Sequence, residues 1–333
     1  MAGPIWALAE LADGRPTRLS LELATLCAQL AATAGREAAV LALGVEADGP
    51  AAAELAAQGP AVLAGPAGLG ADRPAAAVLS PLVAALVGER KPSFLLLPAS
   101  VDGKDLAGAL VALLDWPILV NAAAVRWSDD GPVAQMSTFG GRLVTESVLT
   151  EDHGLVLVRS GSVTAAVAAS SGPIEDVTVA VEAAVVESAG QPAAVVVSQR
   201  VAESSAAASI EEARVVVAGG RGVAGPAGFA VIEDLAEAFG GAVGATRAVV
   251  DAGWYPYSQQ IGQTGKIVKP ALYVAAGISG AIQHKVGMQT SGTIVAINRD
   301  PDAPIAEFAD LVVVGDLFEI APRLAAALRA RRG

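Results

Sequence analysis

Short apolar runs alternate with longer segments of helical periodicity in the first third of the chain. The apolar runs predict strands at 5–8, 39–43, 61–63 and 94–97, and the segments with helical spacing predict helices at 18–34, 51–58, 72–88 and 102–114. Such alternation is typical of parallel strands covered by helices, and Ser100 stands where it can cap the helix that Asp102 begins. The N-terminal part is therefore predicted to be an α/β domain with a mostly parallel sheet.

The pattern changes after residue 118, where β-rich pieces follow one another without helices between them. Strands are predicted at 133–139, 143–149, 155–158, 177–186 and 195–197. We expect this β-rich segment to pair as antiparallel or mixed strands that complete the N-terminal domain.

A second domain is predicted after a small, polar segment without strand periodicity. The expected boundaries are an N-terminal α/β domain at 1–203, which would carry the interface with any partner subunit, a linker at 204–210 and a second domain at 211–333. Strands at 214–218, 243–247, 271–275, 293–297 and 311–314 alternate with helices at 226–239, 279–286 and 317–330. This order predicts a doubly wound C-terminal domain.

Composition excludes several classes of function. The chain has 333 residues, of which 53% are hydrophobic, which is enough for two ordinary cores. A net charge of -12 argues against nucleic acid as a partner. Cys27 is the single cysteine, which fits a reducing compartment. Charges or Gly and Pro interrupt every apolar run before the roughly 20 residues that span a bilayer, and the N-terminus lacks a basic leader, so we expect no membrane insertion and a cytoplasmic protein.

Three glycine-containing or polar blocks fall within fewer than fifty residues in the second domain. They are Gly262 to Lys266, Gly277 to His284 and Ile294 to Asn298. Glycine lets the backbone approach a ligand closely, and each block lies at or beside the end of a predicted strand. The pattern predicts a site for a large cofactor at one edge of the sheet.

Three other interpretations start from a glycine motif earlier in the second domain. The G-x-G-x-x-G at 220–225, followed by Arg247, is compatible with an NADP-dependent oxidoreductase, with a plain tight turn, or with a scaffold that keeps an unused nucleotide cleft. The later glycine blocks favour a larger cofactor, because a simple dinucleotide fold does not require them. A Walker loop is excluded at 262–266, since Ile267 stands in place of the Ser or Thr. No further ligands accompany His284, so a metal site is not expected.

These motifs resemble the alpha subunit family of electron-transfer flavoprotein. The resemblance is dense over 273–287 and 294–301, extends to 219–222, 244–247, 251–254 and 315–318, and is looser at 96–100, 102–106 and 158–161. Residues 256–260 depart from the pattern common in the family, and Arg299 stands where lysine is usual.

The resemblance implies that the C-terminal domain binds FAD and names the residues that hold it. It implies that Thr264 lies at the redox edge of the flavin, Arg247 over the ring, His284 near the pyrimidine carbonyl and Ser279 near the pyrophosphate. It implies no catalytic and no metal-binding residue. The full set of implied FAD contacts is Arg221, Thr246, Arg247, Ile261, Gly262, Gln263, Thr264, Ser279, Gly280, Ala281, Ile282, Gln283, His284, Asn298, Asp316 and Leu317.

The resemblance also implies a function and partners. The chain would be the FAD-carrying alpha subunit of a heterodimer with the beta subunit, on which AMP is expected. It would accept electrons from dehydrogenases, including the acyl-CoA dehydrogenases of fatty acid beta-oxidation. It would pass them to the membrane-bound electron-transfer flavoprotein-quinone oxidoreductase of the respiratory chain. Such a protein is a redox carrier without a substrate of its own, and the cofactor supplies the chemistry. The sequence leaves open which dehydrogenases donate, and whether the protein is of the bifurcating type.

Overall fold

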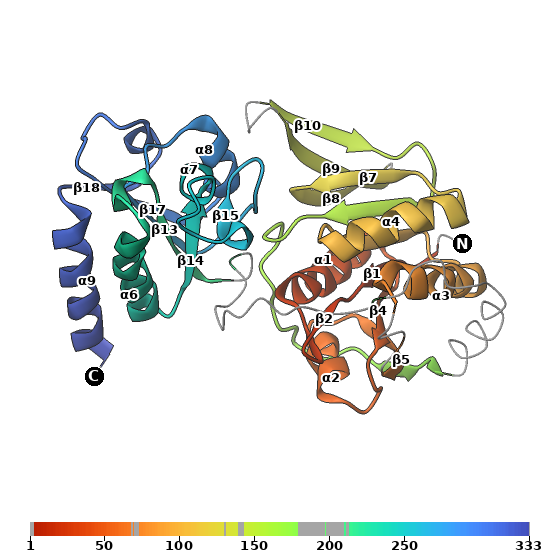
Figure 1. Cartoon of the computed structure of the whole chain (residues 1–333). Helices are drawn as coiled ribbons and strands as arrows, with labels where there is room; N and C mark the ends of the chain where they lie inside the picture. Colours follow the sequence, from red (N-terminus) through yellow and green to blue (C-terminus); the bar gives the residue numbers. More distant parts are fainter. Residues whose placement is uncertain are drawn as a thin grey trace. The chain divides into compact units, whose positions relative to one another are not determined.

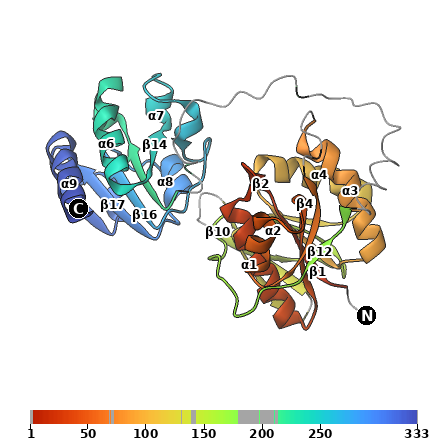
Figure 2. The same cartoon turned by 90° about the horizontal axis from the view of Figure 1, so that it is seen from below.

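The computed structural model describes residues 3–67, 69, 73–129, 131–138, 143–178, 197, 210 and 213–332. The described residues within 1–138 and 143–202 form one compact unit, and those within 203–333 form another (Figures 1 and 2). Apart from Ile210, the predicted linker at 204–210 lies outside the described residues. Ile210 itself is buried in the core of the second unit.

The first unit is built on a seven-stranded sheet in the order β12-β5-β4-β1-β6-β11-β7, and every described strand pair in it is parallel. The strands are β1 (Ile5–Leu8), β4 (Ala38–Gly44), β5 (Ala61–Ala67), β6 (Phe94–Pro98), β7 (Ile118–Ala122), β11 (Gly154–Val158) and β12 (Ile174–Asp176). The predicted strands at the four N-terminal runs are all present.

Helices cover both faces of this sheet because its strands are apolar on both sides. One face packs against α1 (Arg18–Ala34) and α2 (Pro50–Ala56), and the other against α3 (Ala75–Arg90) and α4 (Val101–Leu114). Side chains alternate accordingly along β1, where Ile5 and Ala7 join the first core and Trp6 and Leu8 the second. Helix α3 begins later than the predicted residue 72, directly after Pro74, which fills its N-cap position.

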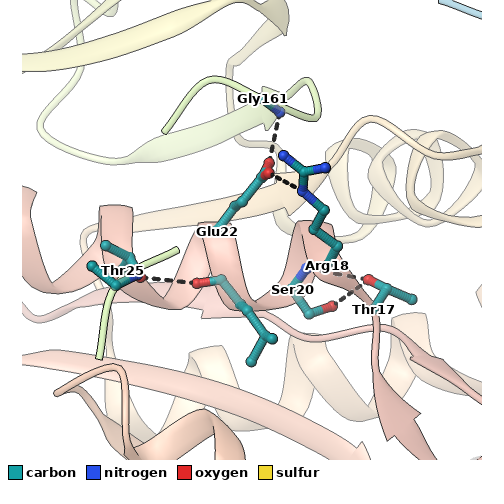
Figure 3. Close-up of polar contacts among 8 residues, drawn as sticks. Thr17, Arg18, Ser20, Glu22, Thr25 and Gly161 are labelled. Carbon is teal, nitrogen blue, oxygen red and sulfur yellow. Dashed lines mark hydrogen bonds and ion pairs between the residues drawn. The ribbon is translucent and has the colours of Figure 1, made fainter. Parts of the chain in front are cut away.

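Polar contacts attach the segment after β11 to α1. The Glu22 carboxylate is almost fully buried and accepts hydrogen bonds from Arg18 Nε at 3.0 Å and from the Gly161 amide at 2.6 Å. Figure 3 shows the Glu22 side chain pointing toward both groups. Thr25 Oγ1, one turn further along α1, accepts from the Ala166 amide at 3.1 Å. These bonds fix a long stretch without regular secondary structure.

The β-rich segment divides between two sheets. Strands β8 (Ala124–Ser128), β9 (Gly131–Thr138) and β10 (Leu143–Val148) form a separate antiparallel sheet, whereas β7 and β11 join the parallel one. Close to the start of the predicted strand at 177–186, the observed strand is β12, which pairs with β5 and ends just before Val177. Residues 179–186, Val195 and Val196 lie outside the described residues.

The second unit contains a six-stranded parallel sheet in the order β15-β14-β13-β16-β17-β18. Its strands are β13 (Val215–Gly219), β14 (Ala242–Thr246), β15 (Gln260–Ile261), β16 (Leu272–Ala276), β17 (Thr293–Asn298) and β18 (Leu311–Val314). Numbered from β13, the order is 3-2-1-4-5-6, so the connections reverse direction between β13 and β16. The predicted doubly wound fold is confirmed.

Helices and loops cover this second sheet on both faces. Helices α6 (Phe229–Phe239) and α9 (Leu317–Arg332) pack on one face, side by side in Figure 1. The opposite face is covered by Met288 of α8 (Ile282–Met288) and by the loop that carries Ile305. Among the described residues, no helix is long and apolar enough to cross a membrane.

Two predicted helices of this unit begin later than the sequence indicates. Helix α8 starts at Ile282 and not at 279, because Gly280 has a φ of +88°, outside the helical region. Helix α6 starts at Phe229, since a 3-10 turn at Pro226–Gly228 takes the place of its expected first turn.

Candidate functional site

A cavity of about 590 Å³ lies at the carboxyl edge of the second sheet. Its wall is formed by the loops that follow β13, β14, β15 and β16, and it is lined by Gly220, Arg221, Thr246, Arg247, Ala248, Asp251, Ile261, Gly262, Gln263, Thr264, Gly277, Ile278, Ser279, Ala281, Gln283 and His284. In an open α/β sheet, ligands bind outside the carboxyl ends of the strands where the connections reverse. The cavity occupies that position.

Close backbone packing joins the loops after β13 and β16, which both contribute to the cavity wall. The Gly222 amide donates to the Gly277 carbonyl at 3.0 Å. A Cβ atom on Gly222 would lie 2.7 Å from the Gly277 Cα, so any larger residue would separate the two loops. Gly277 also needs its φ of +63°. Glycine is therefore required here by contact and by conformation.

The G-x-G-x-x-G at 220–225 does not lead directly into a helix. A 3-10 turn at Arg221–Val223 follows Gly220, and α6 begins only at Phe229. A dinucleotide fingerprint places the pyrophosphate on the N-terminus of the helix that its glycines open. This geometry does not favour the NADP interpretation.

Two side chains at the end of β14 reach the cavity. Thr246 is buried and fills the N-cap position of the short helix α7 (Arg247–Val250), while the Arg247 side chain is 63% exposed. Arg247 Nε donates to the Asp251 carboxylate at 3.1 Å, four residues later on the same turn. An exposed pair of this kind stabilises the fold little, so the guanidinium remains available to a ligand.

The loop after β15 is joined to α8 by main-chain bonds. The Gln263 amide donates to the Gln283 carbonyl at 2.8 Å, and a Cβ on Gly287 would lie 2.4 Å from the Gly262 amide nitrogen. The loop from Gly262 to Lys266 is thus attached to the segment that ends in His284, although the two blocks are separate in sequence.

His284 connects three elements through both nitrogens of its ring. Its Nδ1 lies 3.1 Å from the Ile261 carbonyl oxygen, and its Nε2 lies 2.9 Å from the Tyr273 hydroxyl on β16. Because a carbonyl only accepts, Nδ1 carries the proton, and Nε2 of a neutral ring accepts from Tyr273.

Burial keeps both partners of this contact uncharged. Desolvation lowers the pKa of His284 to about 4, with the bond to the Ile261 carbonyl opposing it weakly. Desolvation raises the pKa of Tyr273 well above its ordinary value. His284 therefore faces the cavity as a neutral imidazole near physiological pH, and any effect on a bound group comes from its dipole and from the loop it holds.

Most residues that the resemblance implies as FAD contacts line this one cavity. Five of the implied residues do not line it: Gly280, Ile282, Asn298, Asp316 and Leu317. Asn298 ends β17 and Asp316 follows β18 at the same edge of the sheet. Asn298 Nδ2 donates to the Ile278 carbonyl at 2.9 Å, and Asp316 forms an ion pair with Arg299.

Sequence reasoning missed three residues that shape the site. Asp251 pairs with Arg247, and the four-residue spacing of opposite charges on one turn was the available signal. Gln260 and Tyr273 contact Thr264 and His284 from behind the cavity wall. Tyr273 lies within an apolar strand and resembles an ordinary core position, whereas Gln260 lies in a strand of two residues and gives no local signal of burial.

The cavity fits a large, partly apolar cofactor with phosphates. Its volume lies within the range of ligand pockets, glycines bring backbone close to the ligand space, and Arg221, Arg247 and Ser279 supply polar groups at the rim. Among the described residues, no group of three or more His, Cys, Asp or Glu side chains could hold a metal ion. Fold and cavity together define a nucleotide-cofactor-binding protein of the doubly wound class.

Comparison with known proteins identifies the family. Residues 5–182 match the electron transfer flavoprotein domain, and residues 209–289 match the electron transfer flavoprotein FAD-binding domain. The electron transfer flavoprotein subunit alpha of Mycobacterium leprae is 46% identical over 252 residues, covering 76% of each chain. The corresponding subunit of Clostridium acetobutylicum is 34% identical over 338 residues, covering 98% of this chain and 97% of its own. The chain therefore belongs to the electron transfer flavoprotein alpha-subunit family, as the sequence motifs predict.

Proposed function

We propose that this chain is the FAD-carrying alpha subunit of a heterodimeric electron-transfer flavoprotein. The observation that carries the proposal is the cavity wall built from the loops after β13, β14, β15 and β16, whose motifs the resembling family uses for FAD. FAD supplies one-electron and two-electron redox chemistry when bound. The chain supplies position, electrostatics and protection from water.

Different side chains contact different parts of the cofactor in this proposal. Arg221, Thr246 and Ser279 hold the phosphates, and the amides that begin α8 add donors where a helix leaves them without partners. Arg247 and Thr264 approach the flavin ring, and His284 holds the loop beside it. Asn298, Asp316 and Leu317 contact the adenosine at the neighbouring strand ends. Gly280 and Ile282 contribute main-chain contacts to the same region.

A beta subunit is the partner, and it covers apolar surface on the first unit. Large apolar side chains are exposed on β7 and β10: Val120 at 49%, Leu143 at 52%, Val144 at 60% and Val148 at 49%. Obligate interfaces bury such surface, and β10 is also the edge strand of its sheet. AMP binds the beta subunit, not this chain.

Electrons come from dehydrogenases, including acyl-CoA dehydrogenases, and leave to the electron-transfer flavoprotein-quinone oxidoreductase. This assignment rests on the family resemblance, and it places the protein between fatty acid beta-oxidation and the respiratory chain. The heterodimer works in the cytoplasm and reaches the membrane only through that oxidoreductase.

Reconstitution with purified partners tests the assignment. The FAD-loaded heterodimer should be reduced by an acyl-CoA dehydrogenase with its acyl-CoA substrate, and be reoxidised by the quinone oxidoreductase. Light scattering of the chain alone should show self-association that ends when the beta subunit is added. Failure of every dehydrogenase to reduce the flavin would contradict the proposed donors, and a stable monomer without the partner would contradict the proposed interface.

A further inference from the structure

Two side chains that precede the loop in sequence bond to Thr264. Gln260 Nε2 donates to Thr264 Oγ1 at 3.1 Å, and the Tyr257 hydroxyl donates to the Thr264 carbonyl at 2.9 Å. Gln260 is 2% exposed and lies behind the cavity wall, whereas Thr264 is exposed on the wall. The buried glutamine thus fixes an exposed hydroxyl.

The backbone holds Gln260 in position for this contact. Its carbonyl accepts from the Lys266 amide at 2.7 Å, which folds the loop back over β15. A Cβ on Gly265 would lie 2.4 Å from the same carbonyl oxygen and 3.0 Å from the Gln260 Cγ. Glycine at 265 therefore allows the loop to close tightly enough for the amide to reach Thr264.

The direction of the hydrogen bond determines what Thr264 offers to the cavity. A side-chain NH₂ group only donates, while a hydroxyl has one proton and two acceptor lone pairs. Since Gln260 occupies a lone pair of Oγ1, the hydroxyl proton is left for an acceptor on the cavity side. We propose that Gln260 is a positioning residue that makes Thr264 a hydrogen-bond donor to the acceptor edge of the flavin ring. This inference rests on the proposed function, because it requires FAD in the cavity.

A fixed donor at that edge has a predictable effect on the cofactor. The flavin gains negative charge on reduction, and a hydrogen-bond donor oriented in advance stabilises that charge more than it stabilises the oxidised ring. Removing the donor should weaken binding of reduced flavin relative to oxidised flavin. Removing Gln260 should have the same effect to a smaller extent, since Thr264 could then rotate.

The test is a mutant cycle on the FAD-loaded complex with the beta subunit. The variants are Gln260→Met, Thr264→Val and the double variant, with Gln259→Met as a control on a neighbouring glutamine whose side chain is not hydrogen-bonded to Thr264. Spectroelectrochemical titration measures the one-electron potential, and FAD content and thermal unfolding establish that each variant is folded. We expect Thr264→Val to weaken reduced-flavin binding about tenfold relative to oxidised flavin, equivalent to ~59 mV. Gln260→Met should give a change of several fold in the same direction, the double variant should match Thr264→Val alone, and Gln259→Met should match the wild type.

Gln260→Glu provides an independent test, because glutamate has the same size and shape as glutamine. An ionised carboxylate only accepts, so Thr264 would donate to it and turn a lone pair toward the cavity. Its effect should be large when Thr264 is present and smaller in the Thr264→Val background, where only the added charge acts. A wild-type potential in Gln260→Met, together with equal effects of Gln260→Glu in both backgrounds, would overturn the inference and leave the proposed function intact. A wild-type potential in FAD-loaded Thr264→Val would instead show that the flavin edge lies elsewhere, and absence of FAD from the wild-type complex would contradict the proposed function.

Discussion

Replacing His284 with glutamine should reduce the sensitivity of the second unit to acid. The His284 ring is 6% exposed, and both of its nitrogens are bonded inside the protein. Glutamine carries an NH₂ group that can donate to the Ile261 carbonyl and a carbonyl oxygen that can accept from the Tyr273 hydroxyl, but it does not titrate. The comparison therefore isolates the effect on stability of the proton that His284 binds in the unfolded chain but not in the folded one.

The sign and size of the effect follow from the lowered pKa. The pKa of His284 is lowered from 6.5 to about 4, so the unfolded chain binds a proton in this window that the folded chain does not. The contribution of His284 to the free energy of unfolding is therefore fully present above pH 6.5 and is lost as the pH falls toward 4. The loss relative to pH 8 is about 2 kcal/mol at pH 5 and about 3 kcal/mol at pH 4.

Hydrogen exchange followed by mass spectrometry gives the required local stability. Peptides from β13 and β16 report opening of the second unit, and comparison of wild type with His284→Gln at each pH cancels intrinsic exchange rates and the titration of the carboxylates. The wild type should lose about 3 kcal/mol more than the variant between pH 8 and pH 4. Parallel loss in both proteins would refute the neutral, buried state of His284.

Three further predictions concern separate parts of the chain. Arg247→Ala should lower the one-electron potential of bound FAD by roughly 40 to 90 mV, because a guanidinium near the ring contributes about 1 to 2 kcal/mol. Arg247→Lys should recover part of this potential, and an unchanged potential in FAD-loaded Arg247→Ala would disprove the role of Arg247. Gly222→Ala should weaken FAD binding in a calorimetric titration, because its Cβ would meet the loop after β16, whereas Gly88→Ala, which has open space in α3, should bind FAD as the wild type does. Glu22→Ala should lower the free energy of unfolding of the first unit by about 3 kcal/mol in denaturant titration, because it removes the buried carboxylate that accepts from the Gly161 amide and from Arg18. A loss within about 0.5 kcal/mol, as at an ordinary surface site, would show that the cluster contributes little.

Local sequence patterns predicted the parts of the fold that depend on local chemistry. Most of the parallel strands are predicted as apolar runs because both faces of each sheet are buried. The edge strands β7, β12 and β15 are not predicted at their observed positions. The glycine blocks after β13 and β16 were visible because close backbone contact leaves few alternatives to glycine. Helix starts are less predictable from the sequence. Gly280, for example, has a positive φ, so residues 279–281 cannot form the first turn of the helix.

Contacts between distant segments could not be read from the sequence. Tyr273 lies inside an apolar strand, and only the packing of α8 against that strand shows that its hydroxyl meets His284. Gln260 lies in a two-residue strand too short to have a periodicity, so nothing local indicated its burial or its bond to Thr264. Division of the β-rich segment between two sheets likewise depends on β11, which pairs with β6 from far earlier in the chain.

The most direct test of the central claim is the cofactor content of the complex purified after co-expression with the beta subunit. We expect a visible flavin spectrum, FAD as the nucleotide released from this chain on denaturation, one FAD per alpha chain, and a lower FAD content in Gly222→Ala, where the added Cβ separates the loops of Gly222 and Gly277. A colourless complex, or one that releases a nicotinamide dinucleotide in place of FAD, would contradict the central claim.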